Sequence, residues 1–153
     1  MPFCPTCQQK LNVIGSRKRR LIRIDGTREN YIIRRLHCKN CNKTHHELPN
    51  FIVPYKRHEA VTIEAIVDGH DNAVPCEVST INRIRAWFAW MIKHLQGCID
   101  ACRMKYGDEI VPFSLLRPIS DDDTPVKGWL TRAVHLAVNS NNWCTYPIGV
   151  FVR

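Results

Sequence analysis

Two Cys-x-x-Cys pairs constrain this chain more than any other feature. The first pair is Cys4 and Cys7 in CPTC, and the second is Cys38 and Cys41 in CKNC. Two intervening residues let a tight turn direct both sulfurs towards one point, and two such turns complete the closed tetrahedral shell of a structural zinc site. A redox Cys-x-x-Cys would need a βαβ setting, whereas a hairpin is predicted here. The pairs therefore predict one structural Zn²⁺.

The segment between the two pairs predicts a β-ribbon with a cysteine knuckle at each end. Strands are expected at 17–24 and 31–38, joined by the hairpin turn signal Asp25-Gly26-Thr27. A short strand at 11–14 and a turn at Gly15-Ser16 should precede them. The first fifty residues carry little aliphatic bulk, so a metal would have to hold them together. We therefore predict a zinc ribbon over residues 1–50.

Charge is distributed unevenly along the 153 residues. The net charge is +8, but residues 1–58 hold 13 basic against 3 acidic side chains, and residues 59–153 hold 9 against 11. Such asymmetry indicates a polyanionic partner, most often nucleic acid. A solvated face without a partner is the alternative. The basic residues of the hairpin predicted to contact phosphates are Arg17, Lys18, Arg19, Arg20, Arg23, Arg34 and Arg35.

Residues 51–153 predict a helical domain, and the whole chain therefore an α+β protein. Helices are expected at 55–68, 79–106 and 125–140, the second capped by Ser79 and the third by Asp121–Asp123, with an apolar tail at 143–152. The first two helices suggest a helix–turn–helix whose second helix reads the major groove; the alternative is a polar face on a packing helix. The predicted reading residues are Ser79, Thr80, Asn82, Arg83 and Arg85.

The remaining motifs favour a protein that is not an enzyme. The sequence has no Gly-rich phosphate loop and no Ser nucleophile elbow. His45 and His46 follow the second knuckle and could replace a zinc ligand, although four cysteines already fill the shell. The other four cysteines, Cys76, Cys98, Cys102 and Cys144, are expected in the core. The absence of a signal peptide or a membrane-length apolar run, together with reduced cysteine pairs, predicts a cytoplasmic protein without membrane contact.

Four stretches carry a resemblance to known proteins: CPTC, RLHCKNCNKTHHELP, FIVPYKRH and STINRIRAWF. In them the chain resembles short zinc-ribbon proteins of Gram-positive bacteria and their mobile elements. It is also similar to the N-terminal DNA-binding module of some insertion-sequence transposases, where a zinc ribbon precedes a helix–turn–helix. The resemblance covers about residues 4–90 and implies DNA binding and a bacterial or phage origin. Too few residues follow Phe88 for a transposase catalytic core, so the resemblance does not support strand transfer.

Together these features predict a zinc-dependent, non-enzymatic protein that binds duplex DNA, either regulatory or transposase-derived. One alternative is a zinc-ribbon interaction module that holds a polymerase, a ribosome or a phage protein through exposed tryptophans. A third reading is an enzyme with His45 or His46 on an open zinc site. The sequence leaves the oligomeric state open.

Overall fold

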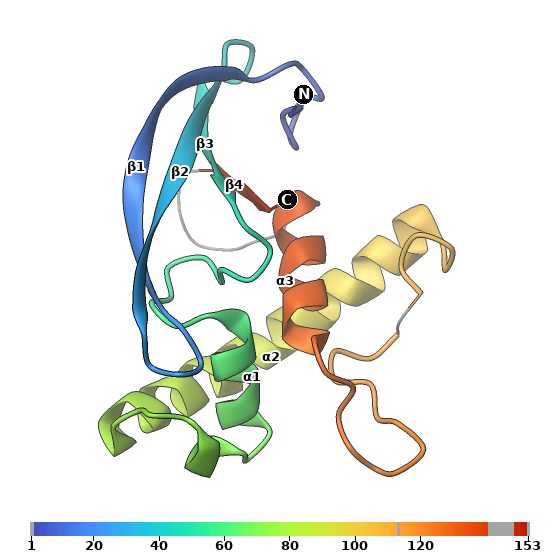
Figure 1. Ribbon diagram of the computed structural model, residues 1–153. Coiled ribbons are helices and arrows are strands. Elements are labelled where there is room, and N and C mark those ends of the chain that lie inside the picture. The colour runs from blue at the N-terminus through green and yellow to red at the C-terminus, as the bar shows by residue number, and fades with distance from the viewer. Residues whose placement is uncertain (1, 113, 141–148, 153) are drawn as a thin grey trace.

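The chain folds into a twisted β-sheet that stands beside a layer of helices (Figure 1). The computed structural model describes residues 2–112 and 114–140, together with the backbone of residues 149–152. Within these residues α1 and α3 contact each other, and both contact the long helix α2. The arrangement is α+β, as the sequence predicts.

The sheet has the strand order β1-β2-β3-β4. β1 and β2 form a hairpin, β3 extends it antiparallel to β2, and β4 joins β3 in parallel. The predicted apolar tail lies partly outside the described residues and ends in β4. The strands are β1 (Asn12–Ile22), β2 (Arg28–Cys38), β3 (Lys43–Leu48) and β4 (Gly149–Val152).

The strands differ from the sequence analysis in two places, a predicted turn that is absent and a strand that was not predicted. The predicted turn at Gly15-Ser16 is absent because β1 continues through it with a bulge between Val13 and Gly15. Gly15 has a φ of +145°, which a side chain would disfavour. The His-rich tail after the second knuckle is a strand, β3, because it pairs with β2 from Arg34↔Glu47 onwards. Its own residues carry only a weak strand signal, and pairing with the neighbouring β2 makes them a strand.

The helices differ from the prediction mainly at their first residues. The predicted helix at 79–106 is confirmed as α2, continuous through Gly97, but Glu77 rather than Ser79 occupies the N-cap position. The helical segments are α1 (Ala60–Val67), the 3₁₀ turn η1 (Asp71–Ala73), α2 (Val78–Tyr106) and α3 (Trp129–Asn139).

Residues 55–59 are not helical, contrary to the prediction, because the sheet uses their backbone. The Ile22 amide donates to the Arg57 carbonyl at 2.7 Å, and the Glu59 amide donates to the Ile22 carbonyl at 3.1 Å. Tyr55 adopts a left-handed φ of +63°, which no helix accommodates. The segment therefore extends the edge of the hairpin, and α1 begins only at Ala60.

The predicted cap at Asp121–Asp123 is also wrong. These residues form a turn in which the Ser120 amide donates to the Thr124 carbonyl at 2.8 Å. α3 begins later, after Gly128 at a left-handed φ of +80°. Its cap comes from another helix: the Glu64 carboxylate accepts the Gly128 amide at 2.7 Å and the Leu130 amide at 3.0 Å. A carboxylate at a helix N-terminus satisfies free amides and favours the helix dipole.

One hydrophobic core joins the sheet to the helices. Leu21 and Ile33 from the hairpin pack with Ile63 of α1, Leu95 of α2 and Leu130 of α3, all fully buried. The predicted division into 1–50 and 51–153 stays a prediction, but this core crosses it. Loss of order in the hairpin should therefore weaken the helical layer as well.

The hairpin turn touches the loop that precedes α2. A Cβ atom added to Gly26, which has φ +84°, would lie 2.9 Å from the Pro75 ring, so the two residues are close together. This contact places the end of the basic hairpin beside the start of α2. Ten residues separate α1 from α2, more than the short turn of a helix–turn–helix. That part of the predicted fold stays a prediction.

Candidate metal centre and basic surface

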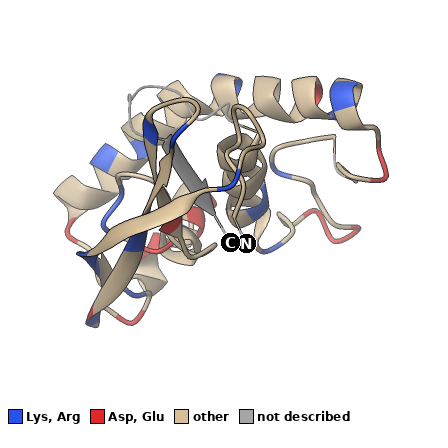
Figure 2. Ribbon diagram, turned by 90° about the horizontal axis from the view of Figure 1, so that it is seen from above, with Lys and Arg blue, Asp and Glu red and all other residues tan. Residues whose placement is uncertain are grey.

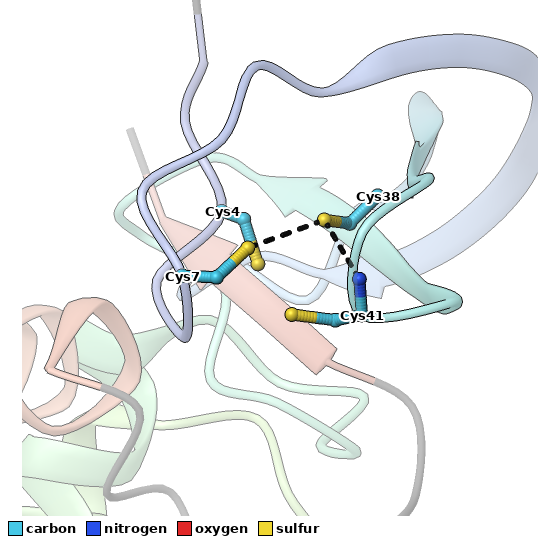
Figure 3. A group of neighbouring side chains, drawn as sticks. All are labelled: Cys4, Cys7, Cys38 and Cys41. Atoms are coloured by element: carbon cyan, nitrogen blue, oxygen red, sulfur yellow. Dashed lines mark hydrogen bonds between the residues drawn. The ribbon is translucent and has the colours of Figure 1, made fainter.

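The four predicted metal ligands come together at one end of the sheet. The sulfurs of Cys4, Cys7, Cys38 and Cys41 all lie within 4.8 Å of one another. Cys7 Sγ is 3.5 Å from Cys38 Sγ, and the four side chains converge on a common point (Figure 3). Sulfurs around a tetrahedral zinc, each about 2.3 Å from the ion, would be about 3.8 Å apart. The arrangement is therefore compatible with a structural metal ion.

Both cysteine pairs are held by the same local backbone device. The residue after the second cysteine of each pair is left-handed: Gln8 has φ +60° and Asn42 has φ +53°. In the first turn the Gln8 amide donates to the Cys4 carbonyl at 2.9 Å. In the second, the Cys41 amide points at Cys38 Sγ at 3.5 Å. Such turns direct two sulfurs the same way, as the spacing predicts.

A small apolar cluster supports the centre. Cys4 and Cys38 are fully buried with Leu36, and Leu11 completes the cluster. This cluster is separate from the main core. Four residues bury too little apolar area to order this end of the molecule alone, so a metal ion would supply most of its stability.

The thiols of the cluster influence one another's protonation. Hydrogen bonds, first from the Asn40 side chain and then from Cys41, lower the pKa of the Cys7 thiol to about 6. Its hydrogen bond to Cys7 is the main cause that raises the pKa of Cys41 to about 12. One proton is therefore retained on one sulfur while its neighbour ionises. A divalent cation would remove this competition, because it stabilises every thiolate that it binds.

His45 lies against the cluster. It is fully buried, and its Nε2 is 3.5 Å from Cys4 Sγ, while its Nδ1 has no hydrogen-bond partner among the described residues. Burial lowers the pKa of His45, so the ring is neutral near pH 7. A proton on Nε2 would be donated to the Cys4 sulfur, which supports the ligand from outside the four-cysteine set.

His46 lies on the opposite face of the sheet from its neighbour His45. Its pKa predicts that the stability of the fold depends on pH. Burial, followed by repulsion from Arg17, Arg35, Arg19 and His45, lowers the pKa of His46 to about 4. Between pH 6.5 and 4 the unfolded chain therefore binds a proton that the folded chain does not, and the free energy of unfolding falls as the pH falls.

Urea unfolding at pH 7.5 and pH 5.0 should show a smaller fall for His46→Gln than for the wild type. The exposed His70→Gln should keep the full fall. Equal falls in the wild type and His46→Gln would contradict the assignment.

The seven predicted phosphate-contacting residues do not share one face. Opposed residues of an antiparallel pair share a face. Arg17 opposes the buried Ile33, so Arg17, Arg19 and Arg35 project on the side of the main core. Lys18 opposes the exposed Ile32, so Lys18, Arg20 and Arg34 project on the opposite side.

Two of these seven basic residues already form ion pairs with carboxylates of the protein. Arg34 makes a double hydrogen bond to Glu47 across β2 and β3. Arg23 pairs with Glu59 at 3.2 Å and donates to the Tyr31 hydroxyl at 2.9 Å. Both arginines therefore have structural roles that the sequence analysis missed.

The predicted reading residues lie at the start of α2 and are mostly exposed. Ser79, Asn82, Arg83 and Arg85 are exposed, and Thr80 is half-buried. Arg85 pairs with Asp71 at 2.8 Å. Arg83 donates to the Ser79 carbonyl at 3.3 Å rather than to an acidic neighbour. Asn82 is the residue of this set with the fewest local constraints on its side chain.

Sequence reasoning also missed three residues that the fold places beside the predicted hairpin arginines. Arg28, Tyr55 and Arg57 lie with the hairpin arginines around one cleft. The sequence signal for Tyr55 and Arg57 was the aromatic and basic YKRH stretch directly after Pro54. It was missed because residues 55–59 were expected in a helix.

The fold and the cysteine cluster define a small α+β protein with a candidate four-cysteine metal centre. The chain belongs to a family described as a domain of unknown function (DUF6431), whose family model matches residues 4–84. The match includes both cysteine pairs, the hairpin, α1 and the start of α2. No curated protein and no solved structure matches the chain significantly. Within the described residues, no helix is both long and apolar enough to cross a bilayer.

Proposed function

We propose that this chain is a zinc-dependent DNA-binding protein without catalytic activity. Its four cysteines would hold one Zn²⁺, because a tetrahedral set of four thiolates is typical of zinc or iron–sulfur centres, and structural zinc needs no further ligand. The two knuckles on a hairpin then make a zinc ribbon. A cytoplasmic site of action and descent from a transposase module belong to the same proposal and depend on the sequence resemblance alone.

The observation that carries the proposal is the exposed, unneutralised charge of the hairpin. Arg17, Lys18, Arg20 and Arg35 are exposed, and none has a carboxylate within ion-pair distance among the described residues. Basic segments recur along the hairpin, whereas acidic segments are spread over several parts of the chain, including the loops after α2 (Figure 2). Repulsion among positive charges concentrated in this way destabilises the folded chain, and a bound polyanion would relieve it.

The start of α2 would supply any sequence readout. It lies beside the hairpin turn through the contact of Gly26 with Pro75. An exposed Asn82 can form a bidentate contact with adenine in a major groove. Helix and hairpin would then contact the same duplex, the hairpin through phosphates.

A salt titration tests the proposal. Replacing Arg17, Arg20 and Arg35 with alanine should flatten the slope of log K against log salt by about 0.9 for each of the three that contacts a phosphate of duplex DNA. A matched variant with alanine at the exposed Lys93, Lys105 and Lys127 loses the same charge from the helical side. It should leave the slope nearly unchanged. Equal flattening in both variants, or no binding at low salt, would contradict the proposal.

One observation favours the interaction module as a second candidate. Trp90 on α2 is 62% exposed and Met104 is 91% exposed, although α2 buries its opposite face. Exposed large apolar side chains can anchor a protein partner. Absence of DNA binding at low salt, with the metal retained, would favour this function.

A further inference from the structure

A cleft at the edge of β1 concentrates positive charge beside an aromatic ring. It has a volume of about 650 Å³. Tyr55 is 44% exposed and lines the cleft. Among the described residues, no acidic side chain lines it. The cationic side chains around it are Arg17, Lys18, Arg19, Arg20, Arg28 and Arg57.

Contacts between segments far apart in the sequence build the cleft. The folded chain therefore holds it in place before any ligand binds. Arg19 donates to the Lys56 carbonyl at 2.7 Å, which ties the 55–57 segment to β1. The Lys56 ammonium lies 4.1 Å from the centre of the Trp87 ring, which anchors the same segment to α2. Tyr55, directly before the anchored Lys56, has a strained left-handed backbone conformation held by its surroundings. A cleft held in this way binds a ligand without a large ordering cost.

The charges of the cleft repel one another. Burial lowers the pKa of Arg19, and repulsion from Arg17 and Arg57 lowers it further, while Tyr55 acts in the opposite direction. Arg17, Lys18, Arg20, Arg28 and Arg57 are exposed at the rim. A bound phosphate chain would relieve the repulsion. Alternate residues of a strand are about 6.7 Å apart, a repeat comparable with successive phosphates of an extended nucleic-acid strand.

We propose that this cleft binds an unpaired stretch of DNA, with phosphates on its arginines and a base stacked on Tyr55. The inference deepens the proposed DNA binding and rests on it. The Tyr55 ring makes the cleft selective for unpaired DNA, because a base inside a duplex is stacked on its neighbours and cannot also stack on a tyrosine. The basic side chains of the cleft alone would bind paired and unpaired DNA alike.

The test is the affinity of the zinc-loaded protein for a 15-nucleotide oligo-dT and for a 15-base-pair duplex, measured by fluorescence anisotropy. Tyr55→Asn removes the ring while suiting the left-handed backbone. It should weaken oligo-dT binding by about 5- to 150-fold, the range of one base–aromatic stack, and leave duplex binding unchanged. Tyr55→Phe should bind oligo-dT as the wild type does. Arg57→Gln should flatten the oligo-dT salt slope by about 0.7, and the exposed Lys10→Gln, outside the cleft, should not.

Several outcomes would overturn the inference. Wild-type protein that binds duplex but not oligo-dT, or Tyr55→Asn that binds oligo-dT normally, would leave the proposed function standing and remove this cleft from it. Equal competition by poly-glutamate would show a site for anions in general. Tighter binding of oligo-U would reassign the cleft to RNA. No binding of either DNA form would defeat both proposals.

Discussion

Replacing Cys38 with serine is expected to release the bound metal and to unfold the hairpin end of the molecule. Cys38 is fully buried, its sulfur is 3.5 Å from that of Cys7, and it ends β2. Structural zinc in small domains contributes about 10–16 kcal/mol of apparent binding free energy. That is comparable with the total stability of most domains, about 5–15 kcal/mol.

The damage should spread beyond the cysteine cluster. β2 also carries Ile33, which is buried in the main core with residues of all three α-helices. Disorder of its last residues therefore removes part of the support of the helical layer. We expect a lower melting temperature for the whole chain, in addition to loss of the ribbon.

Elemental analysis of the purified protein and thermal unfolding by circular dichroism measure these two effects. Cys76→Ser is the matched control, because Cys76 is a half-buried free thiol outside the cluster. It should keep one metal ion per chain. A Cys38→Ser protein with a full metal content, or a chelated wild type with an unchanged melting temperature, would refute the metal centre.

Replacing Glu64 with alanine is expected to destabilise the chain by about 2–5 kcal/mol without releasing the metal. The carboxylate of Glu64 is buried and accepts the amides of Gly128 and Leu130 at the start of α3. Its loss leaves two donors unsatisfied, a buried one at Leu130 and a half-buried one at Gly128, and an unsatisfied buried donor costs about 1–3 kcal/mol. Asp68, one turn further along α1, keeps its 3.0 Å contact with the indole N–H of Trp129. α3 should therefore loosen at its first turn before it detaches.

Urea unfolding measures the effect, and Glu77→Ala is the control. Glu77 is exposed and makes no side-chain cap to α2, so its removal should cost little. Metal content should stay constant in both variants, because Glu64 is a buried carboxylate outside the cysteine cluster. A Glu64→Ala protein as stable as Glu77→Ala would show that the α3 amides find other partners.

Features encoded over short stretches were predictable from the sequence. The two-residue spacing of Cys4–Cys7 and Cys38–Cys41 restricts each pair to a turn that directs both sulfurs one way, and the structure brings the pairs together. The apolar repeat of α2 continues over eight turns, and the helix occupies the predicted residues within one position. Covalent spacing and helical period are local properties, so distant residues change them little.

Features that depend on pairing between distant segments were decided only by the tertiary structure. Whether an arginine of the hairpin faces the core side or the opposite side depends on strand register, and a shift of one residue would exchange the two rows. The 55–59 segment lost its predicted helix because Ile22 engages its backbone. α3 begins where Glu64, sixty-four residues earlier than Gly128, supplies an acceptor. In each case a hydrogen bond to a remote partner outweighs a local preference of a few tenths of a kcal/mol per residue.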